Sequence, residues 1–476
     1  MASDSGSSRP NIVLVHCHDL GRHLHCYGVP TVRSPNLDSL AAAGVRFDRA
    51  FATAPQCSPS RASMVTGRFP HSHGVMGLSQ SNFAWDLHHG ERHVAELLRD
   101  AGYRTGIVGL HHAGRCGAVL PAAFSTQQAF ATEEEIAARC GFDHAELFGR
   151  GEVVADRAIA ELRRASRCDL PFFLEIGFGE PHRRKSLIAP DPDYEGFVGD
   201  YIEPDDSLGV TVPPYLRDEP FARRDFTEFQ GAVRYLDIHA GRIFREIERL
   251  GLDEHTLVVF TTDHGIAMTR AKSTLYDAGI GISLIVRYPA RGWAGGRVQR
   301  ELASNVDLVP TLLDAAGVPA RPAIQGHSLA GLLDGRPGAV RDSVFAEMSY
   351  QNYYDPRRCI RTDRHKLIVY FTASVTLIQQ TGAAALHTTP VTPERISGTF
   401  HPLAELFDLR EDPEELDNVI DRPACRQVRD ELLGRLYRWM RDTGDPLLDG
   451  AIAAPMHGWA LRVLNEASAA VAAKEA

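Results

Sequence analysis

Short apolar runs alternate with amphipathic helical patterns along most of this 476-residue chain. The alternation predicts a largely parallel β-sheet with helices on both faces, because parallel strands need long crossover connections and such sheets are buried on both sides. The candidate strands are Asn11–Val15, Thr105–Val108, Pro171–Ile176, Thr256–Thr261 and Ile282–Val286. The candidate helices are Asn36–Ala43, Val94–Ala101, Val154–Ala165 and Phe229–Leu250.

Polar side chains follow four of these strands directly. In chain order they are His18 with Asp19, His111 with His112, then His182, and finally Asp263 with His264. In open α/β sheets, ligands bind beyond the carboxyl ends of the strands. We therefore expect these groups, although far apart in sequence, to meet in one composite active site.

The last third of the chain changes character after about Tyr354. Short strand candidates at Cys359–Thr362, Lys366–Phe371 and Glu405–Leu409 precede a helical pattern near Cys425–Thr443. A chain of this length exceeds one ordinary hydrophobic core. We predict a disordered tail at 1–9, a catalytic domain at 10–354 and a C-terminal α+β subdomain at 355–476.

Composition narrows the class of protein. A hydrophobic content of 44% and a charged content of 24% are typical of globular proteins. The net charge is -10 and no basic run is interleaved with aromatic residues, which argues against a nucleic-acid partner. The polar start Met1–Ser8 lacks a signal-like apolar segment, and the apolar runs are too short to span a bilayer. With eight cysteines in no tight framework, we expect reduced thiols, no membrane partner and a cytoplasmic location.

One segment carries the strongest chemical signal. It begins Cys57-Ser58-Pro59-Ser60-Arg61 and runs on to Thr66-Gly67-Arg68. Taken alone, Cys57 fits a buried structural cysteine. If a helix begins near Pro59, Arg61 faces the same side as Cys57, and the helix N-terminus favours a bound anion.

This segment resembles the signature of the type I, formylglycine-dependent sulfatases of the alkaline phosphatase superfamily, and most closely their heparan N-sulfatase (sulfamidase) branch. The resemblance implies an alkaline-phosphatase-like sandwich. Its large, mostly parallel central sheet lies between helices, and a smaller C-terminal domain holds a short antiparallel sheet and a helix. It also implies that a formylglycine-generating maturase oxidises Cys57 to 3-oxoalanine, whose hydrate is the nucleophile supported by Arg61.

The same resemblance assigns further catalytic residues. His112 matches the histidine of a strand that ends in Gly-Lys-x-His in the family, but Leu110 stands where the family has the lysine. His182 matches a histidine that contacts the substrate oxyanion or the leaving group. Lys272 follows Asp263 at the distance of a basic clamp residue, and the chain has only four lysines.

The resemblance also implies one divalent metal ion. The family places two adjacent acidic residues where this chain has His18-Asp19, and many members have Asp-Asn where it has Asp263-His264. The implied ligands are His18, Asp19, modified Cys57, Asp263 and His264. Calcium or manganese is expected, with imidazole shifting the preference toward manganese, iron or zinc. His18 either binds the ion or orients a residue that does.

Substrate contacts are less determined. We expect His111 to replace part of the function of the missing lysine and His71 to line the mouth of the pocket. The loops Arg115–Ala138 and Tyr194–Leu216 match no family element. A small anionic sulfated or phosphorylated substrate is expected, and the oligomeric state stays open, with a homo-oligomer among the options.

Three functions follow from these residues. The first is formylglycine-dependent hydrolysis of a sulfate ester or sulfamate on a small or sugar-like substrate. The second is metal-dependent hydrolysis of a phosphodiester or phosphonate monoester, motivated by His264 and Leu110. The third is a non-catalytic binding protein of sulfatase fold, motivated by Leu110 and His18.

Overall fold

The computed structural model of this chain describes residues 9–79, 84–114, 132–188, 195–351, 353–373 and 401–475. The expected disordered tail therefore lies outside the described residues except for residue 9, and so does the 115–131 part of the Arg115–Ala138 loop. Within the described ranges, no helix is both long and apolar enough to cross a membrane. The seven cysteines in these ranges are all free thiols.

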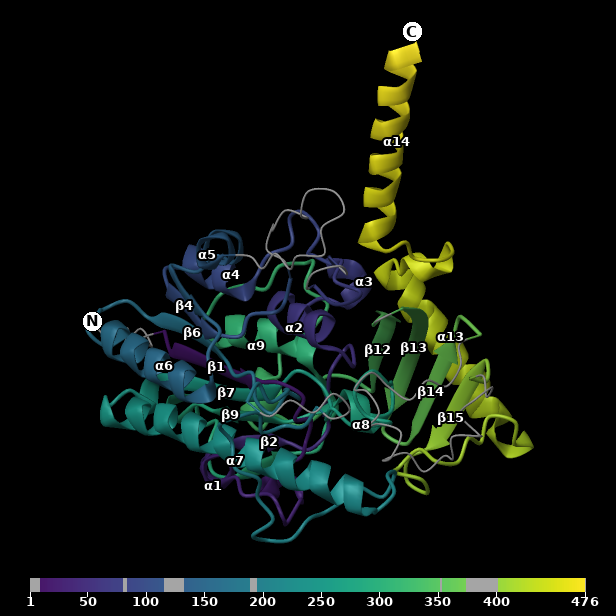
Figure 1. Cartoon of the computed structure of the whole chain (residues 1–476). Coiled ribbons are helices and arrows are strands. Elements are labelled where there is room, and N and C mark those ends of the chain that lie inside the picture. Colours follow the sequence, from purple (N-terminus) through teal and green to yellow (C-terminus); the bar gives the residue numbers. More distant parts are fainter. Residues whose placement is uncertain are drawn as a thin grey trace, which may run out of the picture.

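A large sheet forms the centre of the molecule (Figure 1). Its strands are β1 (Asn11–Cys17), β2 (Val45–Phe47), β4 (Arg104–Gly109), β5 (His144–Leu147), β6 (Phe172–Gly177), β7 (Thr256–Thr262), β9 (Leu284–Arg287) and β10 (Arg297–Gln299). They lie in the order β10-β2-β9-β7-β1-β6-β4-β5. The run from β7 to β5 is parallel throughout. The predicted sheet of mainly parallel strands is confirmed, and its four parallel candidates are β1, β4, β6 and β7.

The single strand predicted over Ile282–Val286 is wrong, because the chain divides there between two sheets. β8 (Gly281–Ile282) joins β3 (Ala50–Phe51) and β11 (Ala303–Ser304) in a three-stranded sheet. β9 continues the main sheet and runs antiparallel to β7. Between them, the amide of Ser283 donates to the carbonyl of Gly21 at 2.9 Å, outside either strand ladder.

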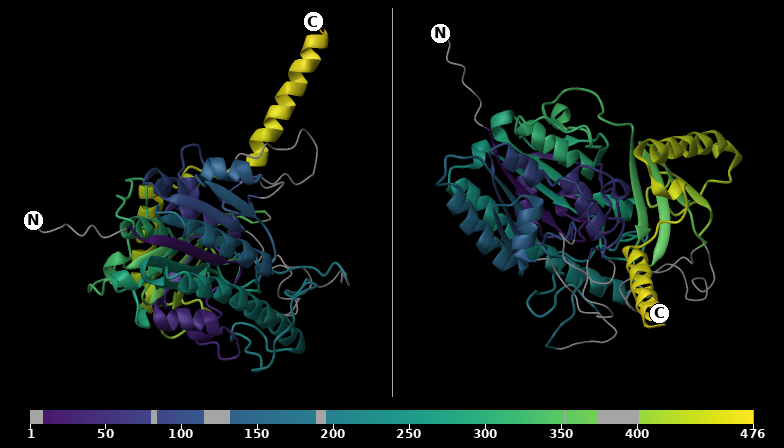
Figure 2. Two further views of the ribbon diagram at one scale, coloured as in Figure 1. Left: turned by 90° about the vertical axis from the view of Figure 1, so that its left-hand side faces the viewer. Right: turned by 90° about the horizontal axis from the view of Figure 1, so that it is seen from above.

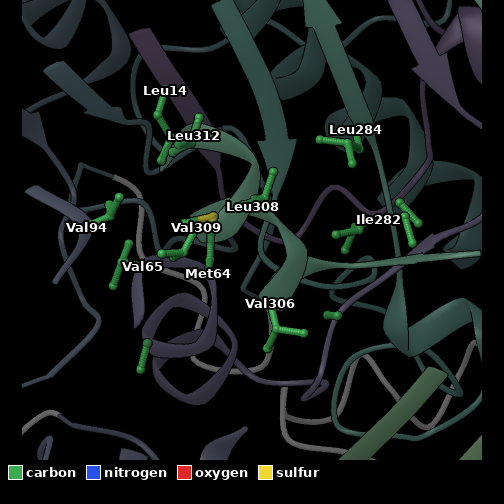
Figure 3. Close-up of a cluster of buried hydrophobic side chains, with 14 of the residues drawn as sticks. Leu14, Met64, Val65, Val94, Ile282, Leu284, Val306, Leu308, Val309 and Leu312 are labelled. Atoms are coloured by element: carbon green, nitrogen blue, oxygen red, sulfur yellow. The ribbon is translucent and has the colours of Figure 1, made fainter. Parts of the chain in front are cut away.

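Helices cover both faces of the main sheet. They are α1 (Pro35–Ala43), α2 (Cys57–Thr66), α4 (Val94–Asp100), α6 (Gly151–Ala165), α7 (Pro220–Arg249) and α9 (Leu308–Ala315). Successive residues of β1 point to opposite faces, as strand geometry requires. Leu14 belongs to the core beneath α2, α4 and α9 (Figure 3), whereas Val13 and Val15 belong to the core beneath α6 and α7.

The helix α7 begins earlier than predicted, at Pro220 rather than Phe229. Proline suits the first turn of a helix, and the buried side chains of Ala222 and Phe226 extend the apolar face toward it. The shorter helices are α3 (Pro70–His73), α5 (Glu133–Cys140), α8 (Asp277–Ile280) and α10 (Ala330–Leu333). In the described ranges, 3-10 turns lie at His25–Tyr27, Asp253–His255, Pro289–Arg291, Asn305–Asp307, Pro423–Cys425 and Pro446–Leu448.

A four-stranded antiparallel sheet lies beside the main body. Its strands, in spatial order, are β12 (Ser343–Tyr350), β13 (Tyr354–Thr362), β14 (His365–Tyr370) and β15 (Ala404–Asp408). The predicted C-terminal sheet and helix are confirmed, the helix being α13 (Arg426–Thr443). The sequence missed β12, which precedes residue 354, while the division into domains at that residue stays a prediction. The last helix, α14 (Pro455–Glu475), projects away from the body (Figures 1 and 2).

Two leucines test this account of the core. Leu14 is fully buried in β1, whereas Leu464 on α14 is 65% exposed. We expect Leu14→Ala to lower the free energy of unfolding by about 2–5 kcal/mol, because it leaves a cavity. We expect Leu464→Ala to change it by no more than about 0.5 kcal/mol. Urea denaturation of both variants measures the difference, and equal effects would contradict the assignment of the core.

Candidate active site

Cys57 is the first residue of α2 and lies at the carboxyl edge of the main sheet. Its side chain is buried, with 4% of the residue exposed. Burial raises the pKa of the Cys57 thiol to about 12. The unmodified thiol is therefore neutral near pH 7 and is a poor nucleophile, since the thiolate is the reactive form.

Arg61 lies one turn further along α2 and is completely buried. Its Nε and Nη2 atoms lie 3.2 and 3.1 Å from Oδ2 of Asp263. Nη2 also donates to the carbonyl of Cys17 at 3.0 Å, and Nη1 donates to Nδ1 of His16 at 2.6 Å. The guanidinium thus links the head of α2 to the ends of β1 and β7.

The five predicted metal ligands come together. One potential ligand atom from each residue lies within 4.8 Å of all the others, and every member is buried: His18, Asp19, Cys57, Asp263 and His264. They come from the loop after β1, the head of α2 and the loop after β7. We call this group the cation cluster.

The hydrogen-bonding state of His264 tests whether a cation fits there. Nδ1 of His264 lies 2.9 Å from the carbonyl of Gly265, so Nδ1 carries the hydrogen and donates it. Nε2 then presents a lone pair, and it is buried without a hydrogen-bond partner. It lies 3.2 Å from Oδ1 of Asp19 and 3.6 Å from Oδ2 of Asp263. A lone pair among carboxylate oxygens is repulsive unless a cation lies between them, so these residues fit a divalent metal ion.

Asp19 is held in place by its backbone and by Lys272. Its φ angle of 53° lies in the left-handed region, and its amide donates to Oδ1 of Asp263 at 2.9 Å. Nζ of Lys272 lies 2.8 and 2.9 Å from the two carboxylate oxygens. Burial alone would raise the pKa of Asp19, but His18 and Lys272 hold that pKa well below its ordinary value. Asp19 is therefore an anion that a lysine and a metal can share.

His18 lies inside the cation cluster. Its Nδ1 is 2.7 Å from Oδ1 of Asp19 and 3.4 Å from Oδ2 of Asp263. Burial lowers the pKa of His18 to about 3, so the imidazole is neutral. This geometry suits a ligand and also suits a residue that orients Asp19.

His182 and His112 flank the cation cluster. The His182 ring lies edge-on to His18 with centroids 4.4 Å apart, and Nε2 is 3.8 Å from Oδ2 of Asp19. Its side chain is 41% exposed, so this histidine is accessible to a substrate. The His112 ring centroid lies 6.1 Å from that of His18. Burial holds the pKa of the His112 imidazole well below its ordinary value, so this ring is neutral.

The two residues predicted to bind substrate lie in other clusters. His111 is buried in a group with His93 and Glu175. His71 is buried between α3 and β12, where Nδ1 lies 2.6 Å from Oε2 of Glu347. Neither belongs to the cation cluster. Their roles toward a substrate stay predictions. Both side chains are packed inside the protein.

The sequence analysis missed His16 and Glu175, which connect to Arg61. Each is a polar residue inside an otherwise apolar strand run, in β1 and β6 respectively. A polar residue within an apolar strand run could have identified both positions from the sequence, because a buried charge is rarely found without a partner.

Comparison with known proteins identifies related families and chains. Residues 10–318 match the Sulfatase family, and residues 265–379 match the family described as N-sulphoglucosamine sulphohydrolase, C-terminal. The chain is 28% identical to human N-sulphoglucosamine sulphohydrolase, over 92% of this chain and 91% of that protein. It is 30% identical to human arylsulfatase A, over 86% of this chain and 83% of that protein.

Two solved structures have the same fold. The yidJ protein of Bacteroides fragilis superposes with a TM-score of 0.72 at 21% identity, covering 94% of this chain and 98% of that one. A protein solved in complex with its substrate D-glucosamine-2-N,6-O-disulfate superposes with a TM-score of 0.66 at 20% identity, covering 92% of this chain and 99% of that one.

The thiol chemistry of Cys57 can be tested in protein made without a maturase. With a pKa raised to about 12 by burial, Cys57 should resist alkylation by iodoacetamide at pH 8. Cys168 is exposed and should react, which makes it an internal control. Peptide mass spectrometry reports both sites. Labelling of Cys57 as fast as Cys168 would contradict the buried site.

The cation cluster predicts stabilisation by a metal ion. Manganese at 100 times its dissociation constant should stabilise the folded protein by about 2.7 kcal/mol. We expect Asp263→Asn to lose most of this gain, because it removes a charged ligand. Asp237→Asn is a matched control, since Asp237 is a buried carboxylate on α7 that accepts hydrogen bonds from Asn36 and Leu37. Thermal unfolding with and without manganese measures the effect, and an equal gain in both variants would exclude this site.

Proposed function

The chain belongs to the sulfatase family and hydrolyses sulfate esters or sulfamates; we propose that it does so with formylglycine at position 57 and one divalent cation. The observation that carries this proposal is the cation cluster, which gathers Cys57, two carboxylates and two imidazoles at the head of α2. Cys57 as a plain thiol is too basic for nucleophilic catalysis. Oxidation to an aldehyde, which hydrates to a diol, supplies an oxygen nucleophile at the same place.

Asp19, Asp263 and His264 would hold the cation, with His18 beside them. We propose manganese, since imidazole ligands favour transition metals over calcium. When bound, the ion supplies positive charge that stabilises developing oxyanions.

The other residues have separate roles in the proposed reaction. Arg61 holds the first turn of α2 against Asp263, so that position 57 keeps its orientation. Lys272 places an ammonium beside Asp19, where it would bind a sulfate oxygen. His182 is partly exposed and would face the leaving group, to which it would pass the proton that the attacking hydroxyl loses. His112 would then remove a proton from the remaining hydroxyl at position 57, which releases sulfate and restores the aldehyde.

We propose an N-sulfated or O-sulfated glucosamine as the substrate class. Support comes from the likeness to human N-sulphoglucosamine sulphohydrolase and from the match of residues 265–379 to the C-terminal family of that enzyme. The structural neighbour bound to D-glucosamine-2-N,6-O-disulfate is consistent with this class.

A second candidate is hydrolysis of a phosphodiester or phosphonate monoester by the same site. It is favoured by His18 and His264 in the cation cluster, which suit a transition metal. Turnover of a phosphodiester faster than any sulfated compound, in manganese, would select this function over the first.

The decisive experiment begins with protein made together with a formylglycine-generating maturase. Peptide mass spectrometry should find the aldehyde at position 57, and the purified protein should release sulfate from N-sulfoglucosamine or glucosamine 6-sulfate. Cys57→Ala and Asp263→Ala should each abolish turnover, because one removes the nucleophile and the other a metal ligand.

Cys168→Ala is the matched control, since that exposed cysteine lies outside the cation cluster and should leave turnover unchanged. Removal of metal with EDTA should stop the reaction, and manganese should restore it better than calcium. Substantial turnover by Cys57→Ala would refute the assignment.

A further inference from the structure

A second group of buried polar residues lies behind Arg61, and the proposed reaction uses none of them. His16 on β1, Glu175 on β6 and His93 at the start of α4 are 0%, 1% and 2% exposed. Oε1 of Glu175 lies 3.0 Å from Nε2 of His16, and Oε2 lies 3.5 Å from Nε2 of His93. Burying such polar groups costs free energy unless they form hydrogen bonds or ion pairs.

The hydrogen positions on His16 follow from its neighbours. A guanidinium can only donate, so Nδ1 of His16 must accept the hydrogen bond from Nη1 of Arg61. The hydrogen of the neutral ring is then on Nε2, where it is donated to Glu175. Burial lowers the pKa of His16, which agrees with a neutral ring. Glu175 therefore fixes the form of His16 that Arg61 requires.

His93 has the same form, and this argues against a second metal site. Its Nδ1 accepts a hydrogen bond from the amide of Ala95 at 3.0 Å, so Nε2 carries the hydrogen and faces Glu175. Ligand atoms of His93, His111 and Glu175 do lie within 4.8 Å of one another. However, a metal would need the lone pair of Nε2, which is protonated when Nδ1 accepts.

Glu175 is thus a buried anion that accepts the hydrogen of His16 at Oε1, while its Oε2 lies 3.5 Å from Nε2 of His93 without forming a hydrogen bond. Burial alone would raise its pKa, but the hydrogen bond from His16 and the neighbouring histidines lower the pKa of Glu175 to about 2. The carboxylate is ionised at any pH at which the protein would be assayed. The negative charge of Glu175 strengthens the hydrogen bond that it accepts from His16.

This arrangement determines how the Nη1 end of the Arg61 guanidinium is held. Nε and Nη2 are held by Asp263 and Cys17, as described above. Among the residues that the structure describes, His16 is the hydrogen-bond acceptor that engages Nη1. The rotation of this end of the guanidinium therefore depends on His16 and, through it, on Glu175.

We propose that His16 and Glu175 are positioning residues for Arg61, and that through Arg61 they hold position 57 in the geometry of attack. The proposal rests on the function proposed above. Both residues are buried and out of reach of a substrate, so the loss of either should slow the chemical step and leave substrate binding unchanged.

Two substitutions of His16 separate the two hydrogen bonds. In His16→Asn, the amide oxygen takes the place of Nδ1 and still accepts from Arg61. In His16→Gln, the longer side chain puts its amide near the place of Nε2, which still donates to Glu175 but offers Arg61 no acceptor. We expect His16→Asn to keep more of the wild-type kcat than His16→Gln.

The third variant is Glu175→Gln, for which we expect kcat to fall about tenfold to hundredfold with KM unchanged, a size typical of residues that orient an active-site group. The matched control is Asp237→Asn, another buried carboxylate changed to its amide, which should keep wild-type kcat. Rates are expressed per aldehyde at position 57, measured by mass spectrometry. Crystal structures of His16→Gln and Glu175→Gln should show a displaced Nη1 end of Arg61, whereas those of His16→Asn and Asp237→Asn should not.

Three results would overturn the proposal. One is an unmoved Arg61 with wild-type kcat in Glu175→Gln. Another is a loss of kcat that follows the thermal midpoint equally in all variants, including Asp237→Asn. The third is a second metal ion per chain bound by Glu175. If wild-type protein fails to hydrolyse any sulfated compound, the proposed function fails, while the position of Arg61 in the variant crystals still decides the role of His16 and Glu175.

Discussion

The buried ion pair between Arg61 and Asp263 is the interaction on which the rest of the site depends. Neither side chain is exposed, and the two oppositely charged groups join α2 to the loop after β7. Removing one partner of a buried pair costs about 3–5 kcal/mol, because the other charge is left in a medium that cannot solvate it. Since Arg61 also bonds to the end of β1, the pair fixes the head of α2 over the strand ends. Position 57 is thereby held within the cation cluster.

The order of strands explains why distant residues meet at this point. β7, β1, β6 and β4 are consecutive neighbours in the sheet and all run parallel, so their carboxyl ends lie along one edge. Asp19 and His112 leave two of these strands with φ angles of 53° and 52°, which non-glycine residues seldom adopt. Such backbone persists where surrounding contacts enforce it, and functional sites are where it collects. At Asp19 the enforcing contact is its amide bond to Asp263.

Local patterns predicted the parallel strands and the groups that follow them, because each is a property of a few consecutive residues. They could not predict which side a loop residue faces. His111 and His112 are neighbours in sequence, yet one packs near Glu175 and the other flanks the cation cluster. The bond between His16 and Glu175 joins residues 159 positions apart, and its geometry arises only when β1 pairs with β6. The sequence analysis missed β12, which pairs with β13 across the predicted domain boundary near residue 354.

Two of the departures from the family pattern offset each other in charge. His18 stands where a second acidic residue is expected, and burial lowers its pKa to about 3, so one negative charge is lost. Leu110 stands where a lysine is expected, so one positive charge is lost as well. Asp19 and Asp263 remain balanced by Lys272 and Arg61, and a divalent cation would leave the site positive toward a sulfate. The two replacements balance in charge, but they change the chemical groups available in the site. In the proposed function, the nitrogen of His18 would stand where an oxygen is expected, which would favour manganese over calcium. The ammonium of Lys272 would then hold the substrate oxygens without a second lysine.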